Sequence, residues 1–333
     1  MNKLTDARIL VIGGAGFIGS HVVDELTKED VKEIVIYDNF CRGSIGNLKI
    51  ALRDPRVRVY EGGGDICQTD ILESAMEGID YVIHLAALWL LQCYEYPRAA
   101  FDVNIRGTFN VLESCLRHKI KRLIYSSSAS VYGNAVEVPM TEEHPYNNRT
   151  FYGATKIAGE QMCRAFYHRY GLEYVGLRYM NVYGPRQDHR GVYTSVIMKV
   201  LDRLDQGLPP IVFGDGSQCY DFIHVTDVAR ANVCALKSDA TDQFLNVGAG
   251  IRTSVKELVE IMLKMMGSNL EIEYRPQHAE QTLVTHRVGS TEKARRTIGF
   301  EARIPLEKGV RSVIEWRRTN KRDVEDDRAG SRI

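Results

Sequence analysis

Short apolar runs alternate with longer amphipathic segments along the first half of the chain. The runs are RILVI at 8–12, EIVIY at 33–37, VRVY at 57–60, DYVIH at 80–84 and RLIYSSS at 122–128. Each has the length of a buried strand, and the segments between them have helical spacing. Helices between short buried strands imply a parallel sheet with right-handed crossovers. The pattern therefore predicts an α/β fold with a doubly wound parallel sheet.

A second, smaller α/β domain is expected after residue 180. The chain there predicts a helix and a strand within 191–216 and an amphipathic helix at 255–267. The runs FIHVTDVARANVCAL and FLNVGAG look like a return to the first sheet. We therefore expect a first domain of residues 1–180 with 222–248, a substrate domain of 181–221 with 249–317, and a charged, disordered tail at 318–333.

The composition argues against several classes of partner. Among 333 residues, Lys plus Arg and Asp plus Glu both number 43, so no basic excess favours nucleic acid. Seven scattered cysteines form neither a CxxC pair nor a Cys/His cluster, so we expect no metal site and a reduced, cytoplasmic protein. Because there is no signal-peptide pattern and no apolar stretch of about 18 residues, we also expect no membrane association.

The first strand runs directly into a glycine turn. Gly13, Gly16 and Gly19 separate this strand from the helix that follows, and Asp38 ends the second strand. Glycines at such a turn let the backbone approach a pyrophosphate at the helix N-terminus, while the acid accepts the ribose 2′-hydroxyl. The turn therefore predicts a Rossmann-type dinucleotide site. Asp38 would repel a 2′-phosphate and so favours NAD over NADP, although the nearby Arg42 weakens that preference.

Tyr152 and Lys156 are four residues apart in a segment with helical spacing, so their side chains share one helix face. A fixed positive charge lowers the pKa of a phenol, and Tyr152 could then act as a general acid/base. Ligands bind beyond the carboxyl ends of parallel strands, so Asp65, the 85–87 turn and Ser126 to Ser128 should line one crevice. Ser128 is therefore expected to meet Tyr152.

Eight ordered motifs extend this pattern over nearly the whole chain, to about residue 317. They are GGAGFIG at 13–19, GDI at 64–66, HLAA at 84–87, VN at 103–104, SSSASVYG at 126–133, YGATK at 152–156, RYMNVYGPRQ at 178–187 and VFGDGSQCYDFIHVTDVA at 212–229. With them the chain resembles the extended short-chain dehydrogenase/reductases that act as nucleotide-sugar epimerases and dehydratases, and most of all the UDP-hexose 4-epimerases.

The resemblance implies a catalytic set of Ser128, Tyr152 and Lys156, with NAD as cofactor. It implies contacts to NAD from Gly13, Gly16, Phe17, Ile18, Gly19, Asp38, Asn39, Asp65, Ile66, Leu85, Ala86, Ala87, Asn104, Ser126, Tyr152, Lys156, Tyr179 and Val182. It also implies that helices 97–118 and 151–171 pair across a two-fold axis, so a homodimer is expected. The pathway it suggests is polysaccharide biosynthesis.

The residues after Ser128 favour one reaction within this family. The 4,6-dehydratases carry an Asp-Glu pair there and the decarboxylases a Glu, whereas this chain has Ala129 and Ser130. Without those carboxyl groups, a 4-keto sugar can only take the hydride back, so epimerisation at C4 is expected. The alternatives are a dehydratase, a decarboxylase or a 4-keto-sugar reductase. An NAD-binding regulator is disfavoured because it has no need of the catalytic set.

The substrate residues depart from the family pattern. Tyr220 stands before Asp221 where an arginine usually grips the diphosphate, and a tyrosine cannot neutralise charge. Arg287 either replaces that clamp or is a surface residue. Trp89 begins an apolar wall facing the sugar or packs in the core. The substrate contacts are thus predicted at Trp89, Ser128, Asn181, Tyr220 and Arg287.

Overall fold

A seven-stranded sheet forms the centre of the computed structural model, which describes residues 4–187, 196–276 and 284–320. Its strands are β1 (Ala7–Ile12), β2 (Val31–Tyr37), β3 (Val57–Val59), β4 (Tyr81–His84), β5 (Arg122–Ser128), β6 (Tyr174–Tyr179) and β11 (Gln243–Val247). They lie in the order β11-β6-β5-β4-β1-β2-β3, and all neighbours are parallel. The predicted doubly wound parallel sheet is confirmed.

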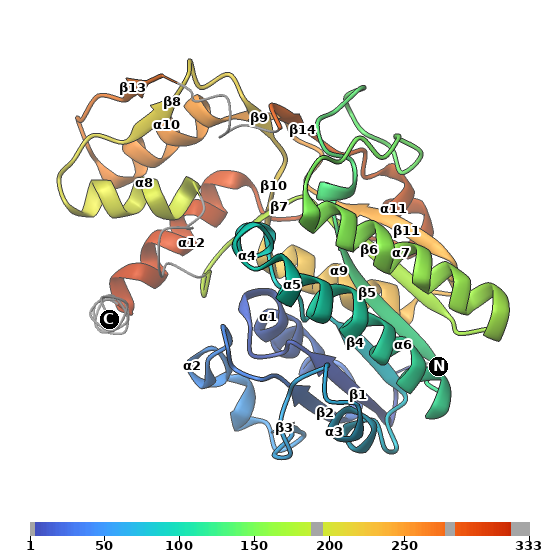
Figure 1. The fold of residues 1–333 in the computed structure, drawn as a ribbon. Coiled ribbons are helices and arrows are strands. Elements are labelled where there is room, and N and C mark those ends of the chain that lie inside the picture. The colour runs from blue at the N-terminus through green and yellow to red at the C-terminus, as the bar shows by residue number, and fades with distance from the viewer. Residues whose placement is uncertain (1–3, 188–195, 277–283, 321–333) are drawn as a thin grey trace.

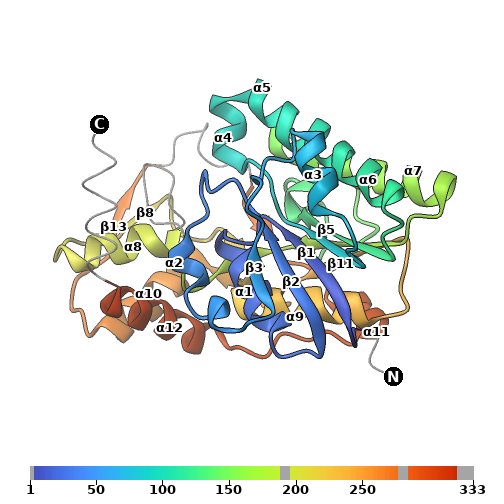
Figure 2. The ribbon, with the colours of Figure 1, turned by 90° about the horizontal axis from the view of Figure 1, so that it is seen from below.

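Helices cover both faces of this sheet (Figures 1 and 2). One face carries α1 (Phe17–Leu26), α9 (Val225–Lys237) and α11 (Glu292–Ile298), and the other carries α3 (Thr69–Ala75), α6 (Thr108–Arg117) and α7 (Phe151–Tyr170). A separate buried apolar cluster lies on each face. Burial on both sides explains why these strands are continuous apolar runs rather than alternating ones.

The helix expected at 97–118 consists of three consecutive pieces. The pieces are α5 (Pro97–Ala100), a π-helical segment at Phe101–Gly107 and α6, and a short helix α4 (Leu90–Glu95) precedes them. A π-segment widens the helix by one residue per turn and is frequent at functional sites. Asn104 lies in the middle of this segment and is buried.

The remaining elements form a smaller lobe beside the sheet (Figure 1). Helices α8 (Val196–Asp205), α10 (Val255–Met266) and α12 (Leu306–Thr319) contribute to a third apolar cluster. Three small sheets accompany them: β7 (Asn181–Tyr183) with β10 (Phe222–His224), β8 (Ile211–Phe213) with β13 (Glu273–Arg275), and β9 (Cys219–Tyr220) between β12 (Thr253–Ser254) and β14 (His286–Arg287).

Two boundaries are relevant to the expected domains. Helix α11 contacts α9 and β11 of the large sheet, although its residues were assigned to the substrate domain. Helix α12 continues to Thr319, and residues 321–333 of the expected tail lie outside the described residues. The division into cofactor and substrate domains stays a prediction. None of the described helices is long and apolar enough to cross a membrane.

Candidate active site

The glycine turn lies where the order of the sheet strands reverses. β1 and β4 are neighbours in the sheet. The turn after β1 also lies against the segment after β4, so closely that a Cβ added to Gly13 would lie 2.8 Å from the Ala86 nitrogen. Gly13 has a φ of 80°, which favours glycine, and a Cβ on Gly19 would lie 2.1 Å from the Gly13 oxygen. This bare backbone at the start of α1, with Phe17 and Ile18 in its first turn, fits a pyrophosphate.

The residues expected around the adenosine lie together after β2 and β3. A Cβ on Gly64 would lie 2.0 Å from the Asp38 carbonyl carbon, so Asp65 and Ile66 lie beside Asp38 and Asn39. The Asp38 carboxylate accepts hydrogen bonds from the backbone nitrogens of Ala15 and Phe40, both at 2.8 Å. Burial raises the pKa of this carboxyl. Asp38 thus ties the glycine turn to the end of β2.

Asn104 holds the loop that follows Ala87. Its Oδ1 accepts from the Leu88 nitrogen at 2.7 Å, and its Nδ2 donates to the Leu88 oxygen at 2.9 Å and to Thr155 at 3.1 Å. The described contacts of Asn104 are therefore to the protein, and they join the Leu85 to Ala87 turn to helix α7. This positioning arises from the π-segment.

Tyr152 and Lys156 lie on α7, which begins where Thr150 accepts a hydrogen bond from the Gly153 nitrogen at 3.0 Å. The Lys156 amine is 5.8 Å from the centre of the Tyr152 ring and donates to the Ser126 carbonyl at 2.7 Å. Ser128, at the end of β5, forms a hydrogen bond that lowers the Tyr152 pKa. The predicted juxtaposition of Ser128, Tyr152 and Lys156 is present.

The electrostatics of this set differ from the expectation. Burial raises the pKa of Tyr152 to about 12, against the opposing hydrogen bond from Ser128 and the charge of Arg287. Burial also lowers the pKa of Lys156 to about 8. The expectation that Lys156 depresses the phenol's pKa is therefore not met by the protein's own groups. The amine is turned to a carbonyl, and burial dominates both values.

A buried ion pair that the sequence reading missed lies directly behind this set. Glu160 and Arg178 are linked by two hydrogen bonds of 2.8 Å, and Glu160 also accepts from Ser127 at 2.6 Å and from Tyr146 at 2.7 Å. Arg178 donates to Tyr132 at 2.8 Å. The pair joins α7, β5 and β6 one turn from Lys156. Its sequence signal was Arg178, a charge within the otherwise apolar run YVGLRYM at 174–180, whereas Glu160 has polar neighbours and gave no signal.

Tyr179 and Val182 lie on the far side of Ser126. The Tyr179 hydroxyl is 3.0 Å from both Ser126 and Asn232, and it is buried. Val182 pairs with Ile223 across β7 and β10. Asn181, one residue earlier, has a buried Nδ2 without a hydrogen-bond acceptor among the described residues. Their contacts to the nicotinamide and the sugar stay predictions.

The expected substrate residues have different surroundings. The Tyr220 hydroxyl donates its single proton to the Val284 carbonyl at 2.9 Å, and its contact to a substrate stays a prediction. Trp89 stacks on the Arg42 guanidinium at 4.7 Å, which links the loop after β4 to the loop after β2. Arg287 pairs with Tyr220 across β14 and β9, and its charge reaches Tyr152.

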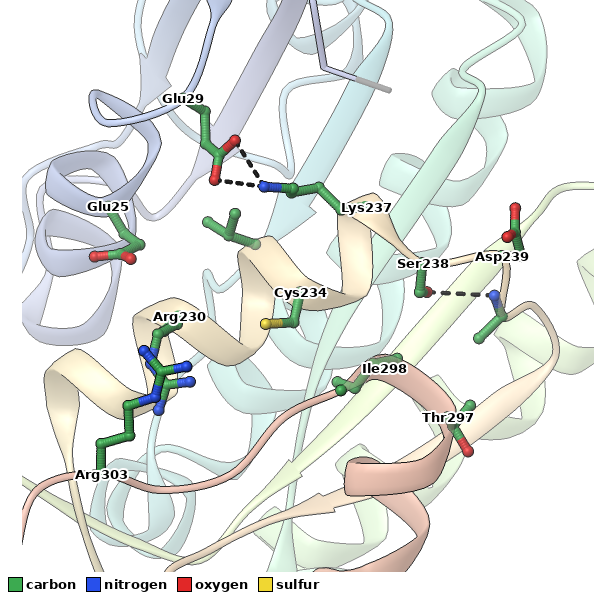
Figure 3. A pocket seen from close by; sticks show the side chains of 13 residues that line it. Glu25, Glu29, Arg230, Cys234, Lys237, Ser238, Asp239, Thr297, Ile298 and Arg303 are labelled. Carbon is green, nitrogen blue, oxygen red and sulfur yellow. Dashed lines mark hydrogen bonds and ion pairs between the residues drawn. The ribbon is translucent and has the colours of Figure 1, made fainter. Parts of the chain in front are cut away.

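A cavity of about 610 Å³ lies elsewhere, over helices α1, α9 and α11 (Figure 3). Cations and anions line it in similar numbers, and several are already paired: Lys237 with Glu29 at 2.9 Å, and Arg230 with Asp227 at 2.6 Å. None of the predicted site residues lines this cavity. It is therefore separate from the Ser128, Tyr152 and Lys156 set.

Among the described residues, no group of three or more His, Cys, Asp or Glu side chains could hold a metal.

A phosphate-binding turn at the strand reversal of a doubly wound sheet, beside a Ser, Tyr and Lys set, defines a dinucleotide-dependent enzyme class. The chain matches the model of the NAD dependent epimerase/dehydratase family over residues 9–248, and it belongs to that family. The family resemblance expected from the eight motifs is confirmed.

Individual relatives cover nearly the whole chain. The UDP-glucose 4-epimerase of Halalkalibacterium halodurans is 33% identical over 92% of this chain and 95% of its own length. A dTDP-glucose 4,6-dehydratase of Actinoplanes sp. is 30% identical over 94% and 98%. The solved UDP-N-acetylglucosamine 4-epimerase of Methanobrevibacter ruminantium, in complex with UDP-N-acetylmuramic acid, superposes with a TM-score of 0.88 at 32% identity, over 95% and 99%.

Proposed function

We propose that the chain is an NAD-dependent epimerase that inverts C4 of a nucleotide-linked hexose through a 4-keto intermediate. One observation supports this proposal most. Ser128, Tyr152 and Lys156 lie together, and the two residues that follow Ser128 in the sequence are Ala129 and Ser130. The set can hold a secondary alcohol and remove its proton, while NAD, when bound, would supply the hydride acceptor. The two residues after Ser128 offer no carboxyl group for eliminating water or carbon dioxide.

Each residue of the set has one task in this proposal. Tyr152 removes the proton of the C4 hydroxyl, Ser128 holds that hydroxyl by a hydrogen bond, and Lys156 fixes the ribose beside the reacting carbon. NAD, when bound, accepts the hydride from C4 and gives it back. Rotation of the keto sugar between these two steps presents its other face to the hydride, and the hydroxyl is rebuilt with inverted configuration when Tyr152 returns the proton.

The protonation state of Tyr152 needs a further positive charge. The protein's own groups leave the Tyr152 pKa at about 12, although the charge of Arg287 already lowers it. The oxidised nicotinamide carries a positive charge, so its binding beside the phenol favours the phenolate. This requirement couples proton removal to the oxidised cofactor.

A homodimer is part of the proposal. Exposed aromatic side chains lie along the helices expected to pair: Tyr96 just before α5, Phe101 in the π-segment, Phe109 on α6 and Tyr170 at the end of α7. The side chains of Tyr96 and Tyr170 are 61% and 60% exposed. Exposed apolar patches of this kind mark association surfaces.

We further propose a cytoplasmic location, since all seven cysteines are free thiols, and a role in supplying sugars for polysaccharide biosynthesis.

The experiment is incubation of the purified protein with UDP-, GDP-, CDP- and dTDP-hexoses, with separation of the products. The proposal expects a reversible mixture of two C4 epimers of one nucleotide sugar and no net change in NAD. A 4-keto-6-deoxy product would instead identify a dehydratase, which is the activity named for the Actinoplanes relative. Stoichiometric consumption of a reduced cofactor would identify a reductase.

A further inference from the structure

Arg287 carries a positive charge into the reacting end of the site. It lies on β14, parallel to β9 and opposite Tyr220. Its neighbour His286 is exposed, and successive side chains of a strand alternate, so Arg287 points to the opposite side, toward the protein. Burial lowers the pKa of Arg287, and the nearby phenols of Tyr220 and Tyr152 raise it. The guanidinium is therefore near the phenol that would act at C4.

Arg287 has no balancing anion among the described residues. Its Nε is enclosed and has no hydrogen-bond acceptor there, and burial lowers its pKa. Three other buried arginines of the described residues do have ion pairs: Arg122 with Glu173 at 2.9 Å, Arg178 with Glu160 at 2.8 Å, and Arg317 with Asp202 at 2.8 Å and Asp205 at 2.7 Å. An enclosed donor without an acceptor destabilises a fold, and a bound anion would remove that cost.

We propose that Arg287 recognises a carboxylate on the sugar, next to C4, so that the substrate class is an acidic nucleotide sugar. This inference rests on the proposed epimerase function. A guanidinium with a free Nε–H and a neighbouring Nη–H presents a planar fork that matches both oxygens of a carboxylate. The acid would be either the C6 carboxylate of a uronic acid or a carboxyalkyl group on O3, since C5 and C3 are the ring neighbours of C4.

The position of Arg287 favours a sugar acid over the diphosphate. The diphosphate is attached at C1, which lies across the pyranose ring from C4, whereas Tyr152 marks the C4 side. Tyr220 pairs with Arg287 across the two strands, and its hydroxyl already donates to the Val284 carbonyl. The Arg287 guanidinium is therefore the polar group of this residue pair that can bind a substrate. The charge of Arg287 is thus placed for a substituent beside the reacting carbon.

The test compares kcat/KM within two pairs of substrates that differ by one acid. The pairs are UDP-glucuronic acid with UDP-glucose, and UDP-N-acetylmuramic acid with UDP-N-acetylglucosamine. In one pair the parent enzyme should prefer the acidic member by about 10- to 100-fold, the usual contribution of a hydrogen-bonded charge. Arg287→Gln should bring that ratio close to one, and Arg287→Lys, which keeps the charge without the fork, should give an intermediate ratio.

The matched control is His286→Gln, an exposed change on the same strand, which should keep the parent's ratio. Calorimetric binding of the same pairs in the Tyr152→Phe background gives the ratio without turnover, and thermal melting checks that Arg287→Gln is folded. If Arg287→Gln weakens both members equally and raises the inhibition constant of UDP by the same factor, Arg287 binds the diphosphate and the inference is wrong. Epimerisation of neutral sugars without acid preference overturns the inference alone, whereas a dehydrated product overturns the proposed function.

Discussion

Tyr152 is the residue on which the proposed chemistry depends most. Tyr152→Phe removes one hydroxyl and keeps the ring, so the fold and NAD binding should persist while turnover falls by about 10²- to 10⁴-fold. The measurement is the rate of epimer formation at saturating substrate, with thermal melting of both proteins alongside. Turnover within threefold of the parent would show that another group moves the proton.

The Lys156 amine makes a prediction about stability and pH. Burial lowers its pKa to about 8, below the ordinary 10.5. Between those values the unfolded chain binds more protons than the folded protein, so this lysine makes stability rise with pH. The parent should therefore gain roughly 3 kcal/mol of unfolding free energy from pH 8 to pH 10.5 that Lys156→Met does not gain.

Urea unfolding of both proteins at several pH values in this range measures that difference. Pairwise comparison cancels the titration of the other lysines and tyrosines, which both proteins share. A difference that stays constant with pH would mean that the folded amine keeps its ordinary pKa and is hydrated.

Sequence spacing predicted which residues meet, but not how their charges are arranged. The order of strand, loop and helix was enough to bring Ser128 to Tyr152. Helical spacing placed Lys156 beside the phenol, yet it could not show that the amine turns to the Ser126 carbonyl 30 residues earlier. The hydrogen bond from Tyr220 to Val284 spans 64 residues, so no local pattern reveals it.

At the scale of elements, the turn between β1 and α1 and the end of β2 set the choice of cofactor. The Asp38 carboxylate is fixed by the nitrogens of Ala15 and Phe40. A second negative charge there would be repelled, so NAD should bind more tightly than NADP and remain bound through purification. Calorimetry on the cofactor-free protein measures both affinities, and tighter binding of NADP would overturn the assignment. In Asp38→Ala the difference between the two affinities should shrink.

The junction of α7, β5 and β6 depends on the ion pair between Glu160 and Arg178. Both side chains are buried, at 0% and 3% exposure, so Glu160→Gln leaves an uncompensated charge. Breaking a buried pair costs about 3–5 kcal/mol of folding stability. The same change should lower kcat, because the new amide has one acceptor oxygen where the carboxylate has two, and Ser127, next to Ser128, must share it with Tyr146 and Arg178.

Tyr146→Phe is the matched control for this prediction. It removes the hydrogen bond to Glu160 and the one accepted from Arg178 but keeps both charges paired, so it should cost only about 2 kcal/mol. Denaturant unfolding measures both variants. Equal losses of stability would mean that Glu160 and Arg178 do not act as a charged pair.

The strands and helices could be predicted because their burial determines where apolar residues stand in the sequence. Strands covered on both faces appear as continuous apolar runs, and five of the seven sheet strands were found from those runs alone. The π-segment around Asn104 was not predictable, since its apolar spacing is close to that of an ordinary helix. The Glu160 and Arg178 pair was missed because pairing across 18 residues depends on the packing of α7 against β6.

For the whole molecule, the exposed aromatic side chains of the π-segment and α6 predict a dimer of twice 37.7 kDa. Phe109 is 42% exposed and packs edge-on against Phe166 at 5.6 Å. Phe109→Glu places a charge in this surface and should shift sedimentation toward the monomer. Ile251→Glu, at a 61% exposed site elsewhere, should leave it unchanged. A parent protein that sediments as a monomer at micromolar concentration would contradict the dimer.

In the proposed reaction, the hydride leaves C4 and returns to the same carbon. The most direct measurement follows deuterium in a nucleotide hexose labelled at C4 and held with the enzyme until both epimers are present. The label should stay at C4 in substrate and product, without exchange into solvent. Appearance of the deuterium at C6, together with loss of water, would rule out return of the hydride to C4 and identify a dehydratase.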